Sequence, residues 1–281
     1  MSTPAAAAPR RADPLARLAL AALFLSLLTG LPLVGLYRPE AARASVEALA
    51  SGWPFGWLLR GMHWAAATAL VAFTLGHLLL ALWRRDDQRA SRGRWWTALL
   101  SGLALILVGL SGFVLRGDAE ALGALAIWRG LLEALPLLGP ALATLVLGVP
   151  GAGLGPVAIH HAGTFSLLAL GLTLHHGLMR WPDLRSWVLV LGGAFCLAAL
   201  LPATLFEGSG AGVVHGPWYL LGLQALLLVS PLWVAGLGAL LLGGALLLLP
   251  RLSDPGRRAL LSGLALLALL HLGGSLWLVL R

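Results

Sequence analysis

The feature that most constrains this chain is a series of apolar runs, each long enough to cross a lipid bilayer. A membrane-spanning helix needs about 20 apolar residues, because each residue adds only about 1.5 Å to the length of the helix. Seven runs meet this requirement, at residues 15–37, 62–83, 95–116, 158–180, 186–205, 228–249 and 259–280. We therefore predict an all-α integral membrane protein with seven transmembrane helices.

Composition supports a membrane protein and argues against the classes that a basic chain first suggests. Hydrophobic residues make up 59% of the chain and charged residues 11%, which is too little charge to cover a soluble domain of 281 residues. All 19 basic residues are arginine, and most lie in short loops between apolar runs, where they set membrane orientation. We therefore expect no nucleic-acid partner. The single cysteine, Cys196, leaves no intrachain disulfide and no four-cysteine metal site.

The distribution of arginine predicts how the chain is oriented. Arginines are most numerous before residue 18 and in the loops after the second, fourth and sixth apolar runs. The positive-inside rule then places the N-terminus in the cytoplasm and the C-terminus outside, in a bacterial-type inner membrane. Residues 1–14 are predicted to be disordered. Residues 117–157 and 206–227 contain Gly and Pro breaks and are expected to form short surface helices on the outer side.

Histidines at matched spacing lie in two of the apolar runs. His63 and His77 are fourteen apart in the run 62–83, and the run 158–180 carries the couplets His160/His161 and His175/His176. Fourteen residues are nearly four helical turns, so both side chains point to one face about 21 Å apart. The two runs have the same direction because one run separates them. They can therefore form two cross-helix histidine pairs at different depths.

Two facing imidazoles are the axial ligand set of a haem iron that transfers electrons. Adjacent helix residues point about 100° apart, so one histidine of each couplet faces the iron. We favour His160 opposite His63 and His175 opposite His77, with His161 and His176 as alternates. Hydrogen bonding between helices is the simpler interpretation for a single membrane histidine. Zinc would need three or four ligands converging on one point.

Several segments resemble the cytochrome b family of cytochrome bc-type quinol oxidoreductase complexes. The segment Gly56–His63, GWLLRGMH, is similar to the entry to the second span of that family, and Tyr37-Arg38-Pro39 to the end of its first span. Further similar segments are Gly112-Phe113, Leu135–Gly139, and His175 followed by Arg180. The resemblance covers roughly residues 15–250. It is to the short seven-span form, here fused into one chain with a divergent outer quinol site.

This resemblance implies a di-haem four-helix bundle over residues 15–185 and a three-helix domain over residues 186–281. It implies two non-covalent b-type haems, with Arg60 pairing with a propionate. The residues expected to pack against haem are Ala16, Gly30, Ala98 and Gly112. Quinone would be the substrate. The implied partners are a Rieske iron–sulfur protein or c-type cytochrome subunits and a second copy of the chain.

The outer quinol site departs from the family pattern, which is P-E-W-Y. Here the sequence is Gly216-Pro217-Trp218-Tyr219, so the carboxylate is missing, and His215 or Glu207 could replace it. On the cytoplasmic side, Arg180 and Asp183 are candidates to carry a proton to quinone. We therefore expect the membrane subunit of a quinol–cytochrome c type oxidoreductase. The alternatives are a non-catalytic electron conduit or anchor without a competent outer quinol site, and a haem-free transporter with histidine proton relays.

Overall fold

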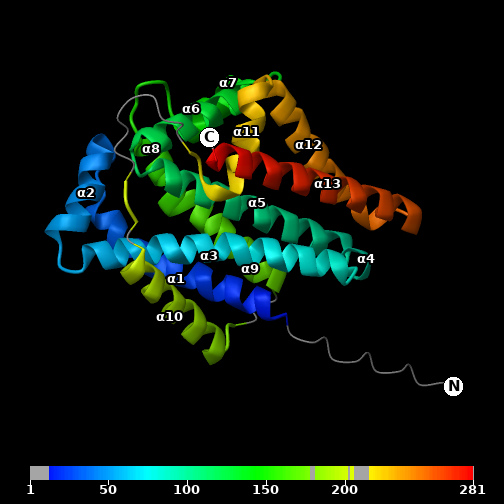
Figure 1. The fold of residues 1–281 in the computed structure, drawn as a ribbon, viewed down its shortest axis with the longest axis horizontal. Coiled ribbons are helices and arrows are strands. Elements are labelled where there is room, and N and C mark those ends of the chain that lie inside the picture. The colour runs from blue at the N-terminus through cyan, green and yellow to red at the C-terminus, as the bar shows by residue number, and fades with distance from the viewer. Residues whose placement is uncertain (1–12, 178–180, 202, 206–214, 281) are drawn as a thin grey trace.

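A computed structural model of the chain describes residues 13–177, 181–201, 203–205 and 215–280, and these residues form helices, turns and loops with no strand (Figure 1). The all-α prediction is confirmed. Six stretches are long and apolar enough to cross a membrane: α1 (Pro14–Leu36), α3 (Gly56–Trp83), α5 (Arg92–Val114), the continuous stretch Gly155–His176, the stretch Leu232–Arg251 and α13 (Asp254–Val279).

The predicted span 186–205 forms a shorter helix, α10 (Leu184–Leu200), of 17 residues. The stretch Gly155–His176 is built from α8 (Gly155–Ile159), the π-helical turn η2 (His160–Phe165) and α9 (Ser166–Gly177). The last two predicted spans correspond to α12 (Leu232–Leu248), which continues into η4 (Leu249–Arg251), and to α13. Two shorter elements, η3 (Trp218–Leu220) and α11 (Leu221–Val229), precede them.

Short helices connect the long ones. The segment 117–157, predicted to hold short helices, contains α6 (Ala119–Glu133) and α7 (Gly139–Leu147). Three further short elements follow α1 and α3, namely η1 (Pro39–Ala41), α2 (Ala42–Gly52) and α4 (Asp86–Arg89). Side-chain caps fix several helix starts, because the first amides of a helix have no partner within it. Asp13, Ser91, Asp118 and Asp183 accept from those amides at the starts of α1, α5, α6 and α10.

The N-terminal helices form two closely packed pairs. Helix α1 packs along α3, and α5 packs along the π turn and α9, while the two pairs approach each other at few points. Small buried residues, among them Ala22, Ala66 and Ala169, let the backbones of these helices come close. Helix α10 covers the outside of α1 and α3 (Figure 1). The arrangement leaves the facing sides of the two pairs available for side chains that reach across.

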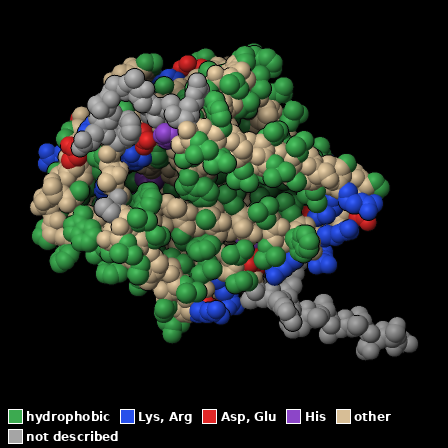
Figure 2. Space-filling model, in the orientation of Figure 1, with side chains coloured by type: hydrophobic (Ala, Val, Ile, Leu, Met, Phe, Trp, Pro, Cys, Tyr) green, Lys and Arg blue, Asp and Glu red, His purple; other side chains and the backbone are tan. Residues whose placement is uncertain are grey.

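An ion pair and a hydrogen bond connect the C-terminal helices to the N-terminal ones near the start of α13. Helix α13 packs tightly against α11, and α12 lies against α5 and α6. Arg257 of α13 pairs with Asp87 of α4, and Trp95 Nε1 of α5 donates to the main-chain carbonyl of Leu246 at 2.8 Å. Figure 2 shows a largely hydrophobic surface, with basic side chains gathered over α4, the α12–α13 turn and the start of α10. At the opposite end, the basic side chains in this view lie beside acidic ones.

Candidate functional site: two pairs of facing histidines

One pair of imidazole rings lies between α3 and the π turn η2. The ring centres of His63 and His161 are 6.3 Å apart, and the ring planes are nearly perpendicular at 86°. Below, these two residues are called the 63/161 pair. His160, the favoured partner of His63 from sequence, points elsewhere. Its Nε2 lies 2.9 Å from the carbonyl oxygen of Leu145, and its ring stacks on Phe165.

A second pair lies between the far end of α3 and α9. The ring centres of His77 and His176 are 6.2 Å apart, and the angle between the ring planes is 57°. These residues are the 77/176 pair. His175, favoured from sequence, is exposed. The structure therefore brings the alternates His161 and His176 opposite His63 and His77, in place of the favoured His160 and His175.

The π-helical turn explains how two histidines fifteen residues apart, the spacing shared by His160/His175 and His161/His176, can both face α3. His161 and His176 are fifteen residues apart, whereas His63 and His77 are fourteen apart. A π turn closes i→i+5 hydrogen bonds and so contains one residue more than an α turn. The turn His160–Phe165 therefore absorbs one residue, and a spacing of fifteen then presents both side chains to one face. Local sequence carries no clear signal for this extra residue.

Hydrogen bonds orient the rings of the 63/161 pair. The Nδ1 atom of His63 lies 3.0 Å from the carbonyl oxygen of Ser26 and 3.2 Å from Oγ1 of Thr29. The Nδ1 atom of His161 lies 3.2 Å from the carbonyl oxygen of Val108 and 3.0 Å from Oγ of Ser111. A carbonyl oxygen only accepts, so Nδ1 is the protonated nitrogen in both rings. The Nε2 lone pair is then free to bind a metal.

Glycines leave room for these rings. A Cβ atom added at Gly30 of α1 would lie 3.0 Å from Cε1 of His63, and one added at Gly112 of α5 would lie 2.8 Å from Cε1 of His161. The two glycines predicted to pack against haem therefore lie directly against the two imidazoles. Ala16 and Ala98 are half-buried, each fourteen residues earlier on the same helix as one of these glycines. The structure places them on the parts of α1 and α5 that lie toward the 77/176 pair.

The distance between paired rings fits a single iron bound by both. Metal–imidazole bonds are about 2.0 Å long, so two imidazoles on opposite sides of one metal have their ring centres roughly 6 Å apart. Both observed separations meet this requirement. Among the residues that the structure describes, no three His, Cys, Asp or Glu side chains converge on one point, as a zinc site would need.

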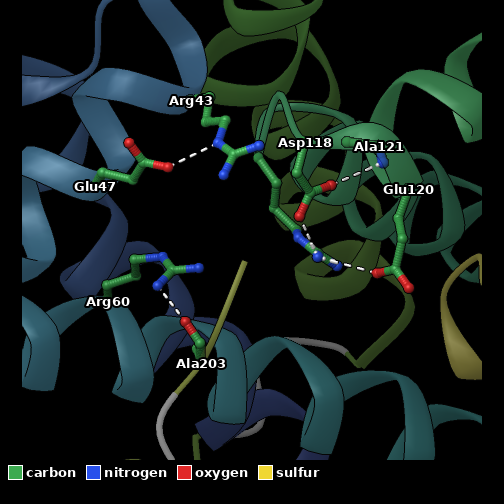
Figure 3. A network of polar contacts seen from close by, with 8 residues as sticks. Arg43, Glu47, Arg60, Asp118, Glu120, Ala121 and Ala203 are labelled. Carbon is green, nitrogen blue, oxygen red and sulfur yellow. Dashed lines mark hydrogen bonds and ion pairs between the residues drawn. The ribbon is translucent and has the colours of Figure 1, made fainter. Parts of the chain in front are cut away.

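Polar side chains gather near the start of α3, on the side of the 63/161 pair (Figure 3). Arg60 of α3 donates to the main-chain carbonyl of Ala203. Arg116, at the end of α5, pairs with Asp118 and with Glu120, the latter at 3.0 Å. Arg43 pairs with Glu47 at 2.7 Å. Arg60 lies three residues before His63, one turn away on the same side of the helix.

The residues predicted to form the outer quinol site are dispersed. Tyr219 projects against α5, since a Cβ atom added at Gly109 would lie 2.7 Å from its hydroxyl oxygen. The Trp218 side chain is exposed, with its ring 5.7 Å from that of Tyr219. The Nε2 atom of His215 lies 3.4 Å from the carbonyl oxygen of Leu278, at the end of α13. Glu207 lies outside the described residues.

On the opposite side, Asp183 caps α10 and pairs with Arg17 of α1. Hydrogen bonds from the Ser186 hydroxyl and amide, together with the ion pair to Arg17, lower the pKa of Asp183 to about 2. These three residues line a hollow of about 380 Å³ between α1 and α10. Arg180, the other residue predicted here, lies outside the described residues.

Comparison with known proteins agrees with this geometry. The family described as cytochrome b/b6/petB matches residues 12–178, which is more than half of the chain. A solved structure described as "Hyperthermophilic respiratory Complex III" is similar with a TM-score of 0.73 and 21% sequence identity, over 96% of this chain and 85% of that chain, which shows a shared fold. Comparison with curated proteins gives no match. The chain belongs to the cytochrome b family, whose members are haem-binding membrane proteins of electron transport.

Proposed function

We propose that the chain is the di-haem b-type cytochrome subunit of a bc-type complex, and that it transfers electrons across the membrane between quinone and partner redox proteins. The observation that carries this proposal is the presence of two imidazole pairs, 63/161 and 77/176, each with its ring centres about 6 Å apart. When bound, each haem supplies a one-electron carrier. With an imidazole from each helix holding it, the iron would have no open position for a further ligand, which suits electron transfer.

The surrounding residues support holding haem at the 63/161 pair. The carbonyl oxygens of Ser26 and Val108 keep the rings of His63 and His161 in the tautomer whose Nε2 binds metal. Arg60 uses Nη1 on the Ala203 carbonyl, and its guanidinium is suited to bind a propionate carboxylate as well. Gly30 and Gly112 give the two imidazoles the space that they occupy.

Quinone is the proposed substrate on both sides of the membrane. The hollow beside Arg17, Asp183 and Ser186 has a volume within the range of small-molecule sites, and these polar groups are the proposed contacts of a quinone there. Arg180 is a further candidate there. On the other side, Tyr219, Trp218 and His215 are the proposed quinol contacts, together with Glu207.

The proposed setting is a bacterial-type inner membrane, with the N-terminus in the cytoplasm and the C-terminus outside. The proposed topology counts α10 as a seventh crossing beside the six long apolar stretches of the described residues. A Rieske iron–sulfur protein or a c-type cytochrome would exchange electrons at the side of the 63/161 pair. A second copy of the chain would complete a homodimer, as in bc-type complexes.

A second candidate is an electron conduit or membrane anchor without a competent outer quinol site. Two observations favour it: Pro217 stands where the family has a carboxylate, and His215 faces a main-chain carbonyl of α13. Quinol would then not reduce the 63/161 haem directly, and current could flow from a partner cytochrome toward quinone.

The experiment that tests the proposal uses the purified full chain. Haem content should be two per chain, and quinol added to the purified chain should reduce both haems. His215→Ala and Glu207→Gln, made separately and together, should slow reduction by quinol while leaving haem content unchanged. A rate that none of these variants changes favours the conduit, and a chain without haem excludes both candidates.

A further inference from the structure

The two histidine pairs differ in what their Nδ1 atoms contact. In the 63/161 pair, each Nδ1 lies beside a carbonyl oxygen and a hydroxyl oxygen, all uncharged, at 3.0–3.2 Å. The Nδ1 atom of His77 instead lies 2.6 Å from the carboxylate oxygen Oδ2 of Asp13. The ring of His176 instead lies beside the main chain of Arg94. A carboxylate therefore contacts one imidazole of the 77/176 pair.

Asp13 is held in place by its position at the start of α1. Its Oδ1 accepts the amide of Leu15 at 2.9 Å, which caps the helix, and Pro14 fixes the first helical residue. The side chain is only 14% exposed. One carboxylate oxygen thus anchors the residue, while the other receives the proton of His77.

We propose that Asp13 is a positioning residue that lowers the reduction potential of the haem bound by His77 and His176 below the value that the same site would have without this carboxylate. This inference rests on the proposed haem function and deepens it. A carboxylate that accepts the Nδ1 proton makes the imidazole a stronger electron donor to the metal. Ferric iron carries one more positive charge than ferrous iron, so a nearby negative charge favours the oxidised form.

Two arginines near the pair act against this effect, namely Arg84 beside Asp13 and Arg94, whose charge acts on His176. Arg84 approaches the same Oδ2 of Asp13, but at 4.0 Å, and its side chain is 36% exposed, so solvent screens it more strongly. Arg17 pairs with Asp183. The charge nearest the His77 ring is therefore the Asp13 carboxylate.

The consequence concerns the direction of electron flow. A lower potential at the 77/176 haem reduces the driving force for an electron that moves there from the 63/161 haem, and it increases the driving force for the reverse transfer. This agrees with an outer quinol site that has lost its family carboxylate.

Asp13→Asn tests the inference because it removes the charge and little else. Asparagine caps a helix as well as aspartate does, and its carbonyl oxygen can still accept the Nδ1 proton. In an optical redox titration of the full chain, the reduction potential of one of the two haem components should rise. The expected rise is at least 59 mV, which is a tenfold change in the equilibrium constant of a one-electron reduction. That component is identified as the one lost in His176→Leu.

The matched control is Thr29→Val, which removes a neutral partner of His63 and should move the other component by less than that amount. If Asp13→Asn moves neither component, or moves both equally, the inference is overturned. If Asp13→Asn loses its haem, Arg84→Gln is the second variant, because it removes the positive charge that lies nearest the Asp13 carboxylate. It should lower the potential of the 77/176 component, and an unchanged or raised potential contradicts the inference. A wild-type chain without haem would instead overturn the proposed function itself.

Discussion

The guanidinium of Arg257, at the start of α13, forms a two-point ion pair with the carboxylate of Asp87 in α4. The Nη2–Oδ1 and Nε–Oδ2 distances are 3.0 and 3.1 Å, and the Asp87 side chain is fully buried. Arg257 also donates to the main-chain carbonyl of Leu82, at the end of α3. This contact joins the loop between the second and third spans to the last span, 170 residues away.

Arg257→Ala should destabilise the protein markedly, because it leaves the Asp87 charge buried without a partner. Loss of one member of a buried ion pair typically costs about 3–5 kcal/mol. Thermal unfolding of the chain in detergent measures the effect, and Asp87→Ala/Arg257→Ala should recover part of it. Arg85→Ala is the control, since the exposed Arg85–Asp254 pair should contribute less than about 1 kcal/mol. Equal effects of Arg257→Ala and Arg85→Ala would contradict this account.

The two adjacent histidines in the π turn should differ in their effect on haem. His161 faces His63, while the Nε2 of His160 lies at the Leu145 carbonyl, so His161→Leu should remove one haem and His160→Leu none. Haem content per chain, from the optical spectrum in pyridine, measures this. A loss of haem in His160→Leu, with full content in His161→Leu, would restore the pairing favoured from sequence.

Gly112→Ala should disturb the 63/161 pair through steric contact alone. The added Cβ atom would lie 2.8 Å from Cε1 of His161, so the ring or the helix must move. We expect an altered spectrum and lower occupancy of one haem. Gly102→Ala, on the same helix with no atom within 4 Å of the new Cβ, is the matched control and should leave the spectrum unchanged. If both variants behave like the wild type, the close packing at Gly112 is not required for haem binding.

The stabilising contribution of Asp183 should depend on pH. Its pKa is lowered to about 2 by hydrogen bonds from Ser186 and by the ion pair with Arg17, from an ordinary value of 3.8. A carboxylate with a lowered folded-state pKa stabilises the protein fully above its unfolded-state pKa, and this stabilisation is lost as pH falls toward 2. The difference in unfolding temperature between wild type and Asp183→Ala should be constant from pH 7 to 5 and shrink below pH 4. A difference independent of pH down to pH 2.5 would contradict the assigned interaction.

Much of the fold could be predicted from the sequence because hydrophobic length decides it. The long apolar runs became helices, and the short helices in 117–157 are present. The resemblance to the cytochrome b family is confirmed by the family match. The pairing of Arg257 with Asp87 could not be predicted, because neither residue carries a local signal for a partner so distant in sequence.

The candidate site shows where helical periodicity is insufficient. On α3 the spacing of His63 and His77 follows a plain α-helix, and both rings meet a partner as expected. On the facing span, the π turn accommodates a spacing of fifteen, which His160/His175 and His161/His176 share, so the spacing does not decide which member of each couplet faces α3. Adjacent helix residues point about 100° apart, and which of them faces α3 depends on how the whole span packs, which the sequence pattern does not fix. The contact between Asp13 and His77 could not be predicted, because the sequence indicates only that Asp13 belongs to the N-terminal tail. The contact depends on how α1 packs along α3.

The most direct test of the central claim is low-temperature electron paramagnetic resonance of the oxidised full chain, with the variants His161→Leu and His176→Leu. Two facing imidazoles should give two distinct low-spin ferric signals in the wild type. Each variant should lose one signal and keep the other. A wild-type chain without low-spin signals, or variants that keep both, would contradict the claim that these two histidine pairs each hold an iron.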